Sequence, residues 1–161
     1  MSKRCLGCME TYDDGLAVCP YCGYIEGTSA DEVIHMVPGT VLRDRYIIGR
    51  VLGYGGFGVT YIGWDARLEH KVAIKEYLPG EFSTRAPGQT QITVFNGVRS
   101  EQFLEGMKKF VEEAKRLAKF QGEDGIVRVF DSVEEIVSAY IIMAYLDGET
   151  LTAYLKREKT V

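Results

Sequence analysis

A glycine-rich stretch lies between two segments that are rich in β-branched and aromatic residues. It reads Gly-Tyr-Gly-Gly-Phe-Gly from Gly53 to Gly58, with residues 46–52 before it and 59–65 after it. Glycines in this order also occur in dinucleotide-binding turns, but such a turn joins a strand to a helix. Here both flanks predict strands, so the stretch predicts a hairpin whose backbone amides can lie directly on phosphate groups.

Further segments extend this pattern into a small sheet with one helix. Residues 70–78, 126–135 and 139–146 are apolar and β-branched, and each predicts a strand. Apolar residues recur with helical spacing through residues 100–120, and Ser100 is the expected N-cap. Three strands, a helix and two strands with short connections predict an antiparallel sheet with one helix packed on it.

Residues 76–100, between the third strand and the helix, are the least regular part of this body. They contain Pro79, Pro87 and a short alternating run at 91–95, which predicts an extra strand or hairpin arm. A docking or regulatory insertion is one interpretation, but a surface hairpin without a function is favoured. The tail at 149–159 predicts the beginning of another helix.

All four cysteines lie near the N-terminus with the spacing C-x2-C-x10-C-x2-C, at Cys5, Cys8, Cys19 and Cys22. Two knuckles of this kind bring four thiolates around Zn2+ in a tetrahedron. A module of about 30 residues buries too little apolar surface to fold alone, so the metal would supply its folding free energy. Two disulfides or four free thiols are the alternatives. Disulfides are disfavoured because we expect no secretory signal at this start.

The chain divides into a zinc ribbon at residues 1–30, a linker at 31–39 and a body at 40–161. Residues 1–37 hold two basic and six acidic side chains, whereas the remainder holds 17 of each sign. Neither part has the basic stripe that binding to a phosphate backbone requires, so we expect no nucleic acid partner. No apolar run approaches the roughly 18–20 residues needed to cross a bilayer, and we expect a cytoplasmic location.

A lysine follows the hairpin at the end of Val72-Ala73-Ile74-Lys75. The glycine hairpin, its strand and this segment, in this order, resemble the N-terminal lobe of a bacterial Ser/Thr protein kinase, from about residue 40 onward. The resemblance implies an α+β fold with a five-stranded antiparallel sheet and an αC helix, here with an insertion between the third strand and the helix. It also implies that Lys75 contacts the α- and β-phosphates of ATP and pairs with a helix glutamate.

The helix offers two adjacent glutamates as that partner. On a helical wheel Glu112 faces solvent, whereas Glu113 lies at the rim of the apolar face, where it can reach a lysine on the sheet. The kinase pattern, with glutamate directly before Ala114, also selects Glu113. In the alternative interpretation both glutamates are simply solvated.

The same resemblance implies a nucleotide pocket. Leu52, Val59 and Ala73 would cover the adenine ring, although each is equally well explained as core. The hairpin would cover the phosphates with Gly53, Gly55, Gly56, Phe57 and Gly58.

The strand at 139–146 would run into the hinge of the kinase. Met143 would be the gatekeeper, the Ala144 carbonyl and the Leu146 amide would face the adenine edge, and Asp147 would contact the ribose. Kinases commonly have glutamate where this chain has Ala144. We expect little consequence, because the hinge acts through backbone groups.

The H-R-D and D-F-G segments that supply a kinase with its base and metal ligands do not occur in these 161 residues. We therefore expect Mg2+ to bind only with a C-lobe, and this chain by itself to be inactive. The favoured interpretation is a zinc ribbon and N-lobe cut from a longer kinase, which transfers the γ-phosphate of ATP to Ser or Thr of protein substrates.

Two other functions stay open at this point. One is a nucleotide-sensing or pseudokinase-like regulatory binding module, and the other is a zinc-ribbon adaptor for nucleic acid. The presence of Lys75, Glu113 and the complete glycine hairpin favours the kinase over a regulator, which has less need of phosphate-positioning groups. The acidic ribbon, made more negative by four thiolates around one Zn2+, disfavours nucleic acid and indicates a structural role or a docking site for a protein partner.

Overall fold

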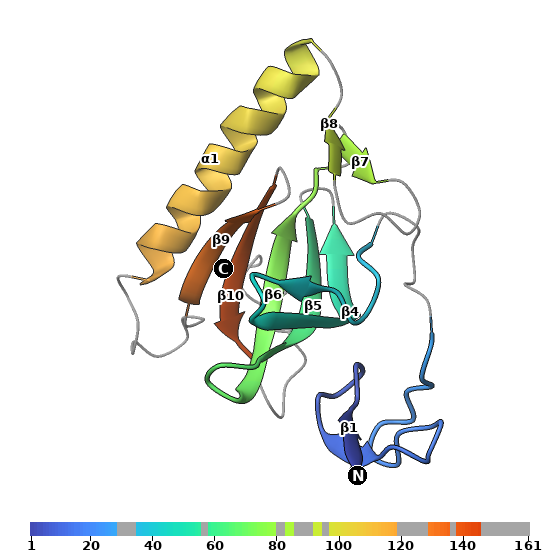
Figure 1. Ribbon diagram of the computed structural model, residues 1–161. Coiled ribbons are helices and arrows are strands. Elements are labelled where there is room, and N and C mark those ends of the chain that lie inside the picture. The colour runs from blue at the N-terminus through green and yellow to red at the C-terminus, as the bar shows by residue number, and fades with distance from the viewer. Residues whose placement is uncertain are drawn as a thin grey trace.

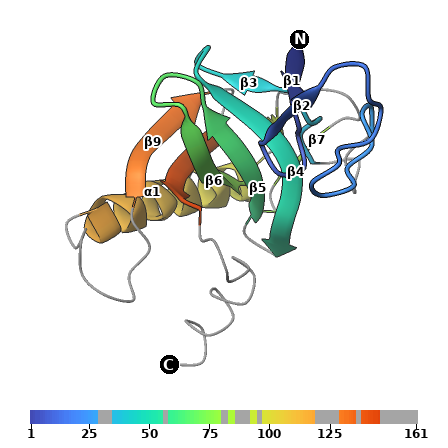
Figure 2. The same ribbon diagram turned by 90° about the horizontal axis from the view of Figure 1, so that it is seen from below.

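The computed structural model describes residues 1–28, 35–55, 58–79, 83–85, 92–94, 97–118, 129–135 and 138–145. Its elements are, in chain order, β1 (Ser2–Arg4), β2 (Thr11–Asp13), β3 (Val41–Leu42), β4 (Tyr46–Gly55), β5 (Gly58–Asp65), β6 (His70–Tyr77), β7 (Ser83–Arg85), β8 (Ile92–Val94), α1 (Val98–Ala118), β9 (Val129–Glu135) and β10 (Ser138–Ala144). Figure 1 shows the main sheet with α1 along β9 and β10, and Figure 2 shows α1 crossing one face of that sheet.

The main sheet is antiparallel, with the strand order β3-β4-β5-β6-β10-β9. The five expected strands are all present, and the two-residue strand β3 extends the edge beside β4. This arrangement confirms the expected α+β fold with one helix and an insertion before it. Lys75 lies on the central strand β6, opposite Thr60 of β5 and Ile141 of β10.

The helix begins slightly earlier than the sequence pattern predicts. Val98 is its first residue, and Gly97 precedes it with a positive φ of 76°. Ser100 therefore lies in the first turn, where its hydroxyl donates a hydrogen bond to the Gly97 carbonyl at 2.8 Å. The expected N-cap role of Ser100 is wrong, because a cap must precede the first helical residue.

Two apolar clusters pack against the main sheet. The smaller one lies on the helix-covered face, where Ala73, Ile141 and Met143 pack with Val129 and with Ala114 of α1. The larger one includes the opposite face, with Tyr61 and Ile74, and it is joined by Met36 from the linker and Ile92 from β8. It also reaches α1 at the end of β6, where Tyr77 packs against Phe103.

Strands β7 and β8 pair with each other as a hairpin within the 76–100 insertion. A hairpin there agrees with the sequence pattern, but it does not lie loosely on the surface. Ser83, Arg85 and Ile92 are all buried. Through Ile92, the described part of the insertion thus joins the larger apolar cluster, and β8 also lies beside α1.

No helix among the described residues is both long enough and apolar enough to span a bilayer. The expected tail helix at 149–159 lies outside the described residues.

Candidate functional site

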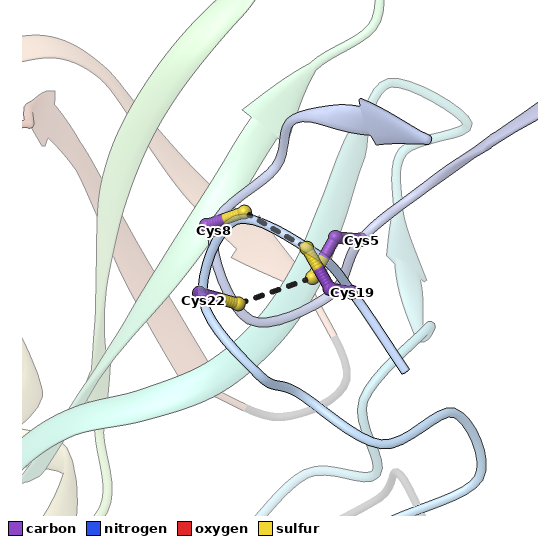
Figure 3. A group of neighbouring side chains, drawn as sticks. All are labelled: Cys5, Cys8, Cys19 and Cys22. Atoms are coloured by element: carbon purple, nitrogen blue, oxygen red, sulfur yellow. Dashed lines mark hydrogen bonds between the residues drawn. The ribbon is translucent and has the colours of Figure 1, made fainter. Parts of the chain in front are cut away.

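The four cysteines come together from two loops of the N-terminal module, with their sulfurs facing one another (Figure 3). All four sulfur atoms lie within 4.8 Å of one another. The Sγ atoms of Cys5 and Cys22 are 3.5 Å apart, and those of Cys8 and Cys19 are 3.8 Å apart. A tetrahedral ion with metal–sulfur bonds of about 2.3 Å holds its sulfurs about 3.8 Å apart. These separations are too long for disulfides and fit a four-thiolate metal site.

Backbone amides of both knuckles point at sulfur. The Gly7 amide donates to Cys5 Sγ at 3.2 Å, and the Tyr21 amide donates to Cys19 Sγ at 3.4 Å. Gly7 is required here, because a Cβ at this position would lie 2.6 Å from the Cβ of Tyr24. Such bonds offset the negative charge of thiolates, so the loops suit an anionic sulfur cluster.

The thiols differ in how easily they ionise. Burial and hydrogen bonds from the other thiols raise the pKa of Cys8 to about 12. Burial also acts on Cys19, but hydrogen bonds from the amides of Cys22 and Tyr21 and from the other thiols together outweigh it and lower the pKa of Cys19 to about 7. A metal ion must therefore displace protons from this cluster at neutral pH, and its affinity falls as the pH falls.

Lys75 extends from β6 towards α1. Its ammonium lies 5.7 Å from the ring centroid of Phe110, which is three residues, or almost one turn, before Glu113. The half-exposed carboxylate of Glu113 accepts two hydrogen bonds from Arg116, both at 2.6 Å. The glutamate is thus held by its own helix in this structure, and its pairing with Lys75 stays a prediction.

The structure brings three of the expected pocket residues together. Leu52, Ala73 and Met143 share the apolar cluster on the α1 side of the sheet. Val59 packs in the other cluster, because the register places it opposite Glu76 rather than opposite Lys75. The structure therefore does not bring Val59 together with these three.

The glycine hairpin is paired to its tip, where Gly55 lies opposite Gly58. A Cβ at Gly58 would lie 2.1 Å from the Glu76 carbonyl oxygen, so packing against β6 by itself demands glycine there. Ala144 lies opposite Val72 at the end of β10. The expected contributions of Gly56, Phe57, Leu146 and Asp147 fall outside the described residues.

No family model matches the chain. The chain does match curated proteins. It is 29% identical over 120 residues to the serine/threonine-protein kinase PrkC of Bacillus subtilis, and 32% identical over 114 residues to PknB of Mycobacterium leprae. These matches cover 74% and 68% of this chain. The chain is homologous to bacterial Ser/Thr protein kinases. It spans about 15% of the length of these relatives.

A solved kinase structure, "PpkA-294 apo form", superimposes with a TM-score of 0.67 at 28% sequence identity. The match covers 79% of this chain and 44% of that chain. The sheet and α1 therefore have the fold of a protein-kinase N-lobe.

A buried polar network in this kinase lobe was missed by the sequence reasoning. Glu76, directly after Lys75, forms an ion pair with Arg85 of β7, and both side chains are completely buried. Arg85 Nη1 donates to Glu76 Oε1 at 3.1 Å, and the Tyr61 hydroxyl donates to the same oxygen at 2.8 Å. The Met36 amide donates to the Tyr61 hydroxyl at 2.9 Å.

This network joins the linker, β5, β6 and the insertion. Burial and the neighbouring carboxylate of Glu76 raise the pKa of Tyr61, so its hydroxyl stays a neutral donor. An arginine in an otherwise irregular insertion is the only sequence signal, and it does not reveal its partner.

Proposed function

We propose that this chain is the ATP-binding N-lobe of a Ser/Thr protein kinase, preceded by a zinc ribbon. The observation that carries the proposal is the position of Lys75. It lies on the central strand, next to the strand of the glycine hairpin, and extends towards α1. A lysine in this place can neutralise phosphates that lie beneath the hairpin.

The pocket residues support the same function. Leu52, Ala73 and Met143 form an apolar surface on the Lys75 side of the sheet, suited to a purine ring. The peptide groups of Ala144 and Leu146 would supply the polar contacts at the adenine edge, and Asp147 would contact the ribose. In the longer kinase, a C-lobe would add the Mg2+ ligands and the base that this chain lacks.

We further propose that the four cysteines hold Zn2+. The sulfur separations and the amide hydrogen bonds support this ion, since zinc prefers four thiolates in a closed tetrahedral site. Bound zinc would supply folding free energy to the ribbon rather than chemistry.

The deciding experiment is the substitution Lys75→Met in the full-length kinase. We expect autophosphorylation to fall by at least about 100-fold, because the charge that orients the phosphates is lost. The thermal midpoint should change little, because Lys75 is only partly buried. Lys108→Met, an exposed lysine on α1, is the matched control and should leave phosphorylation intact. Phosphorylation that persists in Lys75→Met would exclude the role given to Lys75.

A second prediction concerns nucleotide binding by these 161 residues alone. We expect Mg-ATP to bind only weakly, with a Kd of roughly 1 mM or above, because one wall of the cleft comes from the C-lobe. Titration followed by NMR chemical shifts measures this directly.

That titration also tests the alternative, a nucleotide-sensing regulatory module. The pairing of Glu113 with Arg116 favours that alternative, because a sensor does not need Glu113 for Lys75. Submicromolar binding of ATP by this chain would establish it.

A further inference from the structure

The first cysteine knuckle, residues 5–8, packs directly against β4, the strand that leads into the glycine hairpin. The Leu6 carbonyl accepts a hydrogen bond from the Arg50 amide at 2.9 Å, and the Gly7 carbonyl accepts one from Arg50 Nε at 2.8 Å. Gly49 leaves no room for a side chain, since a Cβ there would lie 2.3 Å from the Leu6 carbonyl oxygen. The knuckle and β4 are therefore fitted to each other at backbone distance.

Strand β4 is irregular at the same place. Ile48 lies opposite Gly63 and Val51 lies opposite Tyr61, so β4 has one more residue than β5 between these pairs. This is a β-bulge, and bulges leave an amide free and re-aim the side chains that follow. The Arg50 amide, within the bulge, is the one that bonds to Leu6. Leu52 of the proposed adenine pocket comes two residues later.

Contacts around this point hold the knuckle on three strands. The Arg4 guanidinium lies 3.5 Å from the ring centroid of Trp64 on β5, and Lys71 of β6 pairs with Glu10 at 2.8 Å. Met9, which follows the knuckle, is completely buried and adopts a positive φ of 64°. This backbone conformation is uncommon for methionine and persists only where the surroundings enforce it.

We propose that the metal-held knuckle positions the glycine hairpin, so that metal occupancy of the four cysteines controls nucleotide affinity. Leu6 and Gly7 lie between the ligands Cys5 and Cys8, so the ion that fixes these cysteines also fixes the two carbonyls that hold Arg50. Without the ion, the knuckle loses its shape, and the Arg50 amide in the β4 bulge loses its hydrogen-bond acceptor, the Leu6 carbonyl. The nucleotide part of this inference rests on the proposed function, whereas the coupling of metal to β4 does not.

The test uses the 15N-labelled chain of 161 residues, first loaded with Zn2+ and then stripped of zinc with EDTA, which is removed before Mg-ATP is added because it also binds Mg2+. Hydrogen exchange of the Arg50 amide reports on the knuckle contact, and an Mg-ATP titration reports on the hairpin. We expect EDTA to speed exchange of Arg50 at least about 10-fold while the Ala73 amide stays protected. We expect the Kd for Mg-ATP to rise about fivefold, as the loss of one positioning hydrogen bond predicts.

Gly49→Ala separates the contact from the metal. It leaves all four cysteines in place, yet its methyl group displaces the Leu6 carbonyl, so the zinc-loaded variant should behave like the EDTA-treated chain. Gly15→Ala is the matched control, because a Cβ there meets only the flexible Asp13 carboxylate, at 3.3 Å. It should match the unmodified chain in both readouts.

The outcomes separate the two proposals. Unchanged exchange of Arg50 after EDTA, or in Gly49→Ala, overturns the inference whether or not ATP binds. Faster exchange with an unchanged Kd also overturns it, because the contact then does not position the hairpin. ATP that causes no shifts at the hairpin in any form contradicts the proposed function, and Arg50 exchange then decides the coupling alone.

Discussion

The substitution Cys19→Ser is expected to abolish stoichiometric zinc binding and to unfold residues 1–28, while the kinase lobe stays folded. Structural zinc contributes about 10–16 kcal/mol of apparent binding free energy in small zinc modules, and in the proposed ribbon that energy would be folding energy. The ribbon has only a small apolar cluster of its own, formed by cysteines, Tyr12 and Tyr24. With three thiolates it cannot close the tetrahedron, and we expect the zinc affinity to fall by more than about 100-fold.

Two measurements check this result. Isothermal titration calorimetry gives the zinc stoichiometry and affinity, and NMR gives the dispersion of ribbon amides separately from that of the sheet. Val18→Ser is the matched control, since Val18 is adjacent in sequence but half-exposed, and its side chain is not a ligand. Unchanged zinc affinity in Cys19→Ser, or a ribbon that stays folded in EDTA, would show that metal does not hold these knuckles together.

The main architecture was predictable because its signals are local. The alternation in β4, β5, β6 and β10 and the helical spacing in α1 each occur within one segment, and the expected order of elements is confirmed. The cysteine cluster was predictable for the same reason, because the spacing itself fixes two knuckles. These features need no knowledge of which distant segments meet.

The features that the sequence did not predict depend on contacts between segments that are far apart in the chain. Val59 was expected beside Ala73, but strand register decides the face on which a side chain lies, and a shift of one residue reverses it. Here Val59 lies opposite Glu76. The role of Gly49 depends on its contact with Leu6, 43 residues earlier in the chain, which no local pattern reveals.

Arg116 and Lys75 are both candidate partners for the Glu113 carboxylate, and the position of Arg116 on the same helix explains why it binds that carboxylate here. A helical wheel places the Cβ of Glu113 at the rim of the apolar face but does not rank the cations within its reach. Arg116 lies on the same helix face at i+3, so it reaches the carboxylate without any tertiary constraint. An exposed ion pair of this kind contributes only about 0.2–0.5 kcal/mol. Binding of a nucleotide at Lys75 therefore needs little free energy to move Glu113 from Arg116 to Lys75.

The substitution Arg85→Met is expected to destabilise the chain by about 3–5 kcal/mol, because it leaves the Glu76 carboxylate buried without its cation. The loss should appear in urea unfolding at fixed zinc concentration, since bound metal itself changes stability. Arg67→Met is the matched control. Arg67 is exposed in the turn after β5, and its substitution should stay within about 0.5 kcal/mol of the parent.

The double variant Glu76→Gln with Arg85→Met distinguishes an unpaired charge from lost packing. The glutamine oxygen can still accept a hydrogen bond from the Tyr61 hydroxyl, and no unpaired charge is left in the core. Most of the lost stability should therefore be recovered. If the double variant is as unstable as Arg85→Met, the cost comes from the space that the guanidinium filled between β6 and β7. A loss below about 1 kcal/mol in the single variant would mean that water reaches the pair, because only exposed ion pairs are worth so little. The β7–β8 hairpin would then not be held to the core through Glu76, and the stability of β6, the strand of Lys75, would not depend on the insertion.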